Sequence, residues 1–472
     1  MKSSAFFRGS FLKKMNPPYI LLLFMLISAF LLGGGSRADI ISLVVLRPLS
    51  IIACGIAFWT LSLEQVKAHR PLFIATAMIF LIVVIQLMPL PPQLWQSLPG
   101  RAVIIDIDNT AAIVDQWRPL SLAPSETWNA FYSLFTPLSV LLLAVQLEKQ
   151  DRYNILFIII AIGIISGLLG MLQILGDSNG PAYLYEITNR GSAVGLFANR
   201  NHQAVFLAIL FPMLALYAST DSKTPDQQRF RFTLALAIGI FLIPLLLVTG
   251  SRAGMLLGVI GIISAAIIYR KPKVILQPKR RARAKNFSGY LLIAFLTIIM
   301  AGLTVIAARA NAIERLLSKD STEGLRFATL DIILEKSWEV FPFGTGFGSF
   351  ADVYRIIEPD NLLGPAYFNH AHNDWLEIFL TGGLPGLLVL GLACAWVLWR
   401  TKGAFFDLSQ GKPRRRSYAR LGAVIAIMLG IASFADYPLR VPSLMCLWVI
   451  AVVWIQSAFM QDHERHAPAG LR

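Results

Sequence analysis

Charged residues are scarce in this chain, and that scarcity excludes most soluble folds. Of its 472 residues, 15% are charged and 56% are hydrophobic, and the mean hydropathy is +0.62. Apolar stretches long enough to cross about 30 Å of hydrocarbon recur along the sequence, which is typical of a polytopic α-helical membrane protein. Cysteine is also rare. The three cysteines lie inside apolar runs, so neither a disulfide nor a CxxC metal site is indicated.

A signal peptide with a cleavage site is missing too. The first apolar run, "PYILLLFMLISAFLLGGG", follows Lys13 and Lys14 but has no A-x-A site, so we expect an uncleaved first span. The apolar pattern predicts about twelve transmembrane helices, with both termini on one side. They lie near residues 18–34, 40–62, 72–89, 128–147, 154–175, 202–218, 232–248, 254–269, 290–307, 384–399, 421–435 and 443–459.

Acidic residues are absent from the segment between the eighth and ninth predicted spans, which carries eight lysines and arginines. The segment between spans ten and eleven carries seven basic residues against Asp407 alone. By the positive-inside rule, both segments face the cytoplasm. The long segment 308–378 then faces out, and it holds eleven acidic residues against six basic ones. The net charge of +15 is therefore explained by topology, and nucleic-acid binding is not indicated.

A dense polar cluster, "YFNHAHNDWLEIFLTGGLPG", lies at the end of this outer segment. The pattern predicts a short amphipathic helix capped by Asn373 or Asp374, with Asp374-x-x-Glu377 resembling a capping box. Gly382 and Gly383 would end this helix, and Pro385 would start the tenth span. His372 then lies at the start of the helix, facing the outer side of the membrane.

The two histidines of the cluster leave several interpretations open. His370 and His372 form an H-x-H pair, but no third ligand stands at a plausible spacing for zinc. Imidazole titrates near neutrality, so His372 could act as a general base or acid. A structural histidine at the membrane interface fits the same sequence.

Arginines also mark the outer ends of two predicted spans. "GLFANRNHQAVF" places Arg200 and His202 at the start of the sixth span, and "VTGSRAGMLLG" places Arg252 in a very short turn. A guanidinium group at that depth either reaches lipid phosphate or binds an anionic substrate. Two such arginines on the same face as the histidines favour a shared anionic substrate, because guanidinium suits phosphate oxygens. Arg47, inside the second span, is expected to pack against an acid or a carbonyl.

These motifs resemble the O-antigen ligase and Wzy-type polysaccharide polymerase superfamily of bacterial inner membranes. The family pattern of His-Asn, nine residues and Gly-x-x-Gly is matched by His372-Asn373, Gly383 and Gly386. The segments "NRNH", "SRAG", "RPLSLAPSET" and "FPFGTGFGSF" also look familial. The resemblance implies an all-α fold of about twelve spans with a large periplasmic loop between the ninth and tenth. The divisions would be transmembrane helices in 1–307, the loop in 308–383, and the last helices with a cytoplasmic tail in 384–472.

The resemblance further implies a glycosyltransferase whose active site faces the periplasm. A glycan would move from undecaprenyl diphosphate to a hydroxyl acceptor, such as a lipid A-core sugar, with inversion and without metal or cofactor. Arg200, Arg252 and Arg326 would hold the diphosphate, and His372 would take the acceptor's proton. His370, His202, Asn373, Gly383 and Gly386 would support the site, and whether His370 or Arg47 takes part is open.

Two other functions compete with this interpretation. A Wzy-type polymerase would use the same diphosphate site and base, and the loop 90–127, with Trp95, Trp117 and Arg118, is long enough to seat an extended saccharide. A lipid-linked glycan flippase or other transporter would place its charges near the bilayer midplane and show repeated halves. No internal repeat is visible in this sequence.

Overall fold

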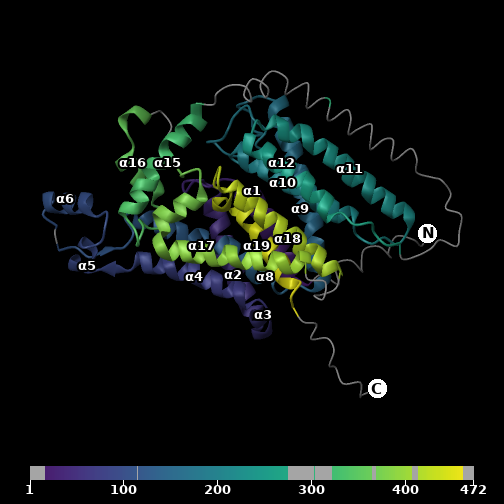
Figure 1. The fold of residues 1–472 in the computed structure, drawn as a ribbon, viewed down its shortest axis with the longest axis horizontal. Helices are drawn as coiled ribbons and strands as arrows, with labels where there is room; N and C mark the ends of the chain where they lie inside the picture. Colours follow the sequence, from purple (N-terminus) through teal and green to yellow (C-terminus); the bar gives the residue numbers. More distant parts are fainter. Residues whose placement is uncertain are drawn as a thin grey trace, which may run out of the picture.

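The computed structural model of the chain describes residues 16–113, 115–274, 302, 321–363, 368–406 and 413–460. Within them the chain is mostly helical. The helices are α1 (Pro17–Leu32), α2 (Leu43–Thr60), α3 (Leu63–Ala68), α4 (Arg70–Leu87), α5 (Pro92–Gln96), α6 (Ala102–Thr110), α7 (Pro124–Ser133), α8 (Phe135–Ala144), α9 (Lys149–Leu175), α10 (Arg200–Ala218), α11 (Pro225–Val248), α12 (Arg252–Ile268), α15 (Ser321–Glu339), α16 (Phe350–Ile357), α17 (Asp374–Phe406), α18 (Pro413–Ala432) and α19 (Pro442–Ser457) (Figure 1).

Strands are almost absent from the described residues. The short strands β1 (Pro89–Leu90) and β2 (Arg118–Pro119) pair antiparallel, with Pro89 opposite Pro119. Two short 3₁₀ helices cover Asp360–Leu362 and Pro438–Arg440.

Seven helices of the described part are long and apolar enough to cross a membrane: α2, α4, α7 with α8, α9, α10, α11 and α17. The apolar helices α1, α12 and α19 are shorter, at 16 or 17 residues. Every predicted span except the ninth coincides with a helix of the fold. The ninth, near 290–307, lies outside the described residues apart from residue 302. A multi-pass helical membrane fold is therefore supported, and the count of twelve stays a prediction.

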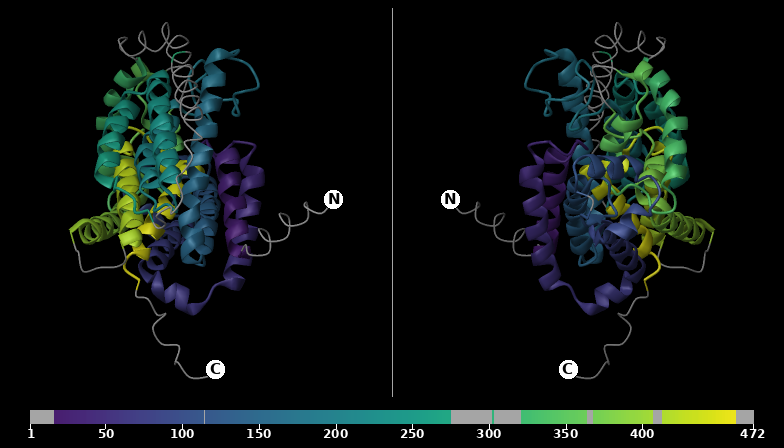
Figure 2. Two further views of the ribbon diagram at one scale, coloured as in Figure 1. Left: turned by 90° about the vertical axis from the view of Figure 1, so that its right-hand side faces the viewer. Right: turned by 90° about the vertical axis from the view of Figure 1, so that its left-hand side faces the viewer.

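Helix α10 forms the centre of the bundle and is almost wholly buried. It packs closely against α12: an added side-chain carbon on Gly254 would collide with Ala204, and one on Gly261 with the Ala208 carbonyl. Because both residue numbers rise together along the contact, the two helices run parallel. Small residues at such a crossing allow two backbones to approach closely. Figure 2 shows α1 and α2 side by side at the edge of the bundle. The parallel arrangement brings the N-termini of α10 and α12 to the same end of the bundle.

The connecting segments gather at two opposite ends. At one end, which we call the site end, the segments 33–42, 176–199, 249–251, 368–373 and 433–441 meet. Here Gly34 O accepts from Ala198 N at 3.0 Å, Gly33 O from Ser443 N at 3.0 Å, and Ser433 O from Asp374 N at 2.9 Å. At the other end, the Gln146 amide reaches Ala57 O, and Arg415 reaches Met460 O. This alternation agrees with the loop order that the charges predict.

Helix α17 is broken where the sequence predicts a break. Gly383 has φ 54° and ψ −150°, and a side chain there would collide with the Pro342 carbonyl. The glycine-rich segment 342–348 fills the break, with Thr345 N donating to Leu380 O and Leu384 N donating to Pro342 O. Gly386 faces Ile378 across the kink. The glycines of the His-Asn-x9-Gly-x-x-Gly motif thus shape the backbone that follows the histidines.

Candidate active site

His372 lies at the turn that precedes α17, in a left-handed conformation with φ 50°. Asn373 caps the helix by accepting a hydrogen bond from Leu376 N at 3.1 Å. The His372 Nδ1 is 3.0 Å from Oδ1 of Asp436, which comes from the loop between α18 and α19. The imidazole is 13% exposed and the carboxylate 3%. The fold therefore joins two residues that are 64 positions apart in the sequence.

Asp436 connects this histidine to the start of α10. Its Oδ2 accepts from the Asn201 side-chain amide at 2.7 Å and from that of Asn199 at 3.3 Å, and its Oδ1 accepts from Tyr437 N at 3.1 Å. A carboxylate at Nδ1 favours the tautomer with the proton on Nδ1, which leaves Nε2 as the nitrogen that can accept a proton. The pair is thus oriented as a general base and its positioning acid.

Arg200 and Arg252 begin the two parallel helices at this end. Asn199 caps α10 through Asn201 N at 2.8 Å, and Ser251 caps α12 through Gly254 N at 3.0 Å. The two starts are adjacent, since a side-chain carbon added to Gly250 would lie 3.8 Å from Nη1 of Arg200. Helix N-termini and guanidinium groups both favour anions, so this corner is electrostatically suited to phosphate.

His370 belongs to a second network. Its Nδ1 is 3.1 Å from Oε1 of Glu377, and the same oxygen is 3.1 Å from Nη1 of Arg440. Arg440 also donates through Nε to Asp374 Oδ1 at 3.1 Å, and Glu377 Oε2 accepts from Ala371 N at 2.9 Å. The prediction that Asp374 and Glu377 form a capping box is therefore wrong. Both carboxylates pair with Arg440 instead, and the helix is capped by Asn373.

Tyr437 holds the histidines together. Its ring centroid lies 4.4 Å from that of His370, 4.9 Å from that of His372 and 5.0 Å from that of His202. His202 is almost fully buried on the first turn of α10. All three histidines that the sequence singled out thus surround one aromatic ring, which comes from a loop that the sequence reasoning passed over.

The remaining predicted residues lie as follows. Arg326 is on α15, in a part of the helix whose side chains fall outside the described residues. Trp95 is buried, with its indole N–H bonded to Gln116 O, and Arg118 pairs with Asp108. The prediction that the 90–127 loop offers Trp95 to a saccharide is therefore wrong, because this side chain packs inside the loop. For Arg118, whose side chain is 35% exposed, it stays a prediction. Trp117 stays 63% exposed.

Asp436, Tyr437 and Arg440 are the residues that sequence analysis missed. They stand in "FADYPLRVP", a short polar segment between the eleventh and twelfth predicted spans. The charge alternation places that segment on the same side of the membrane as the histidines. An acid and an arginine in it could therefore have indicated further site residues. Among the described residues, no group of three or more His, Cys, Asp or Glu side chains is arranged to hold a metal ion.

The geometry supports the chemistry of proton transfer beside an anionic leaving group. A positioned imidazole can accept the proton of a hydroxyl, and guanidinium groups in a water-poor site stabilise charge that develops on a phosphate. Both elements are present at the site end, linked through Asp436 and the Asn199–Asn201 turn.

Residues 234–391 match the family model described as O-antigen ligase. This segment runs from α11 through the break in α17 and includes Arg252, His370 and His372, whereas Arg200 and Asp436 lie outside it. No curated protein matches the chain. The segment carries "SRAG", "FPFGTGFGSF" and the His-Asn-x9-Gly-x-x-Gly motif, whereas "NRNH" and "RPLSLAPSET" lie before it. This part of the chain is therefore similar to the O-antigen ligase family.

Proposed function

We propose that this protein is an O-antigen ligase-like glycosyltransferase of the bacterial inner membrane. It would transfer a glycan from undecaprenyl diphosphate to a hydroxyl of a lipid A-core sugar, on the periplasmic side. The observation that carries the proposal is the His372–Asp436 pair, held against the arginine-bearing start of α10 in a chain with an O-antigen ligase domain.

In the proposed reaction, the acceptor oxygen attacks the anomeric carbon of the donor glycan. The new bond is C–O to the acceptor, and the bond that breaks joins the anomeric carbon to the diphosphate. The electron pair leaves with the diphosphate, whose charge Arg200 and Arg252 would stabilise. The acceptor's proton moves to Nε2 of His372, while Asp436 holds the imidazole and stabilises its charged form. Attack opposite the leaving group inverts the anomeric centre.

The test is a transfer assay with purified protein. Undecaprenyl diphosphate carrying a glycan is mixed with lipid A-core acceptor, and the products are separated by mass. We expect glycan on the acceptor and free undecaprenyl diphosphate in equal amounts. A transporter would leave the donor chemically intact, so an unchanged donor under conditions that keep the protein folded contradicts the proposal.

A Wzy-type polymerase is the second candidate, since it needs the same diphosphate site and base. The burial of Trp95 removes one of the groups that favoured it. In cells, loss of a ligase leaves polymerised glycan on its carrier and unattached to lipopolysaccharide. Single repeat units after deletion of this protein would replace the ligase proposal with the polymerase.

A further inference from the structure

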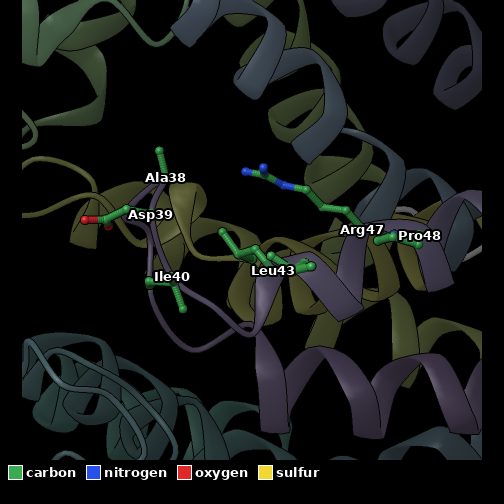
Figure 3. A pocket seen from close by; sticks show the side chains of 7 residues that line it. Ala38, Asp39, Ile40, Leu43, Arg47 and Pro48 are labelled. Atoms are coloured by element: carbon green, nitrogen blue, oxygen red, sulfur yellow. The ribbon is translucent and has the colours of Figure 1, made fainter.

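Arg47 lies in the second turn of α2, beside a cavity of about 390 Å³. The lining comes from the α1–α2 connection and from α2 itself: Asp39, Ile40, Leu43, Val44, Arg47 and Pro48. Figure 3 shows the Arg47 side chain reaching across this space toward Ala38, above Leu43. The volume falls in the range of about 300–1,000 Å³ that is typical of ligand pockets.

The guanidinium group of Arg47 has no acceptor within the described residues. Its Nε is buried without a hydrogen-bond partner, although the group carries five N–H donors. Glu126 on α7 acts on it electrostatically, but no described carboxylate forms an ion pair with it. Among the described residues Arg47 therefore does not pack against an acid or a carbonyl as the sequence led us to expect, and Glu126 acts on it only electrostatically.

The one acid that lines the cavity is already occupied. Asp39 accepts from Arg37 at 3.0 and 2.6 Å, and Figure 3 shows its carboxylate turned away from Arg47. This hydrogen bonding to Arg37 lowers the pKa of Asp39 below its ordinary value. Asp39 therefore stays paired and does not compete for Arg47, which leaves the guanidinium free to meet an incoming anion.

The surroundings of the cavity are those of a lipid headgroup site. Ile40, Leu43 and Val44 supply apolar surface beneath the guanidinium. Ile41, in the α1–α2 connection, is 83% exposed, and Val44, on a face of α2 that the described residues leave uncovered, is 74% exposed. Arg47 lies only about 6 Å along the axis from the first residue of α2, at about 1.5 Å per residue, which is headgroup depth for a spanning helix. A phosphate on Arg47 with its acyl chains along α2 satisfies both kinds of surface.

The cavity adjoins the candidate active site through the segment 33–35. Gly34 O accepts a hydrogen bond from Ala198 N, which directly precedes the Asn199–Arg200 turn. Gly33 O accepts one from Ser443 N, three residues after Arg440. Tyr185 OH accepts from Gly34 N at 2.6 Å, and burial raises the pKa of this Tyr185 hydroxyl to about 12. The chain that leads into the cavity lining is thus hydrogen-bonded to the segments that carry the candidate site.

We propose that the Arg47 cavity binds a phosphate of the acceptor lipid. The identity of that lipid rests on the proposed transfer, which needs two lipid-anchored substrates at once, a donor and an acceptor. Arg200 and Arg252 take the donor diphosphate. A lipid A-type acceptor carries its own phosphates on its sugar headgroup, and Arg47 fixes one of them so that the core sugar reaches His372.

Binding measured without catalysis tests this assignment. Full-length protein in neutral detergent is titrated with lipid A-core, undecaprenyl phosphate or dioleoyl phosphatidic acid, and bound lipid is counted by native mass spectrometry. Arg47→Gln should weaken lipid A-core about tenfold, the value of one charged hydrogen-bonded contact, and leave undecaprenyl phosphate unchanged. Arg200→Gln should give the opposite pattern. Arg190→Gln, at an exposed arginine of the site end, is the matched control and should change neither.

Each other outcome overturns the proposal. Unchanged lipid A-core binding by Arg47→Gln removes the cavity from acceptor recognition. If Arg47→Gln weakens the binding of undecaprenyl phosphate as much as that of lipid A-core, Arg47 belongs to the donor site. If the wild-type protein also binds phosphatidic acid and Arg47→Gln weakens that binding to the same extent, Arg47 is a general contact with bilayer lipid. These readouts stay separate from the transfer assay. A chain that transfers nothing but shows the expected split refutes the proposed function alone, and an active chain without the split refutes only the acceptor site.

Discussion

His370 and His372 differ by two positions and both place Nδ1 on a buried carboxylate, yet they belong to different networks. His370 reaches Glu377, whose charge is shared with Arg440 and with the Ala371 amide. His372 reaches Asp436, which also accepts from Asn199 and Asn201 at the start of α10. One network fastens the start of α17 to the α18–α19 loop, and the other leads to the helix that carries Arg200.

The difference indicates a division of labour. A carboxylate claimed by arginine, imidazole and a backbone amide is fully engaged in holding the fold, since removing one partner strands a buried charge. A carboxylate that accepts from two carboxamides and lies at Nδ1 of an imidazole can respond when that imidazole gains a proton. We therefore assign the structural role to the His370 network and the chemical role to the His372 pair, and the following predictions are chosen to break that assignment.

The largest effect is expected for His372→Ala, which removes the proposed base. Transfer by the purified protein should fall by about 10²–10⁴, because that is the usual contribution of a positioned general base. Insertion into the membrane and the yield of folded protein should be unchanged. The matched variant is His370→Ala, for which we expect a loss of activity below about tenfold. A larger loss for His370→Ala than for His372→Ala would reverse the assignment.

Arg440→Met should destabilise the fold more than it changes the chemistry. It leaves Asp374 and Glu377 buried without their guanidinium partner, and breaking a buried ion pair in this way costs about 3–5 kcal/mol. Thermal unfolding in detergent measures the loss. The combined variant Asp374→Asn, Glu377→Gln and Arg440→Met removes the stranded charges and should recover most of it. No recovery would show that Arg440 acts outside this network.

Asp436→Asn should lower the rate of transfer by about 10² while keeping the side-chain volume. An amide N–H at Nδ1 favours the wrong imidazole tautomer, in which Nε2 already carries a proton. Asp436→Glu, which keeps a carboxylate, should retain more activity than Asp436→Asn. Steady-state kinetics of both variants check this: a lower kcat with an unchanged KM for the donor would show that the loss is not weaker binding. Equal rates for Asp436→Asn and Asp436→Glu would contradict the positioning role of Asp436.

The comparison also shows what the sequence could predict. Hydropathy locates the spans, and Gly382, Gly383 and Pro385 locate the break in α17, because both signals are local. Charge alternation brings the histidines and Arg200 to one end. The Asp374-x-x-Glu377 pattern failed because a local rule competes with Arg440, which lies more than 60 positions away in the chain. His372–Asp436 pairing has no local signature either, since it depends on how α17, α18 and α10 pack.

The smallest effect is expected at Arg200 and Arg252, the two arginines at the starts of α10 and α12. Arg252→Lys keeps the charge at the start of α12 but loses the bidentate fork, so the kcat/KM for the donor should fall about tenfold. Arg200→Lys should cost at least as much, because Arg200 stands between Asn199 and Asn201, and a change there also disturbs the hold on Asp436. The two effects differ in kind: Arg252→Lys raises the donor KM alone, whereas Arg200→Lys also lowers kcat. Arg190→Lys serves as the control for a general change of arginine to lysine at this end of the bundle. Wild-type kinetics for Arg252→Lys would mean that this guanidinium only contacts lipid phosphate. A change confined to the donor KM in both variants would mean that Arg200 and the His372–Asp436 pair act independently.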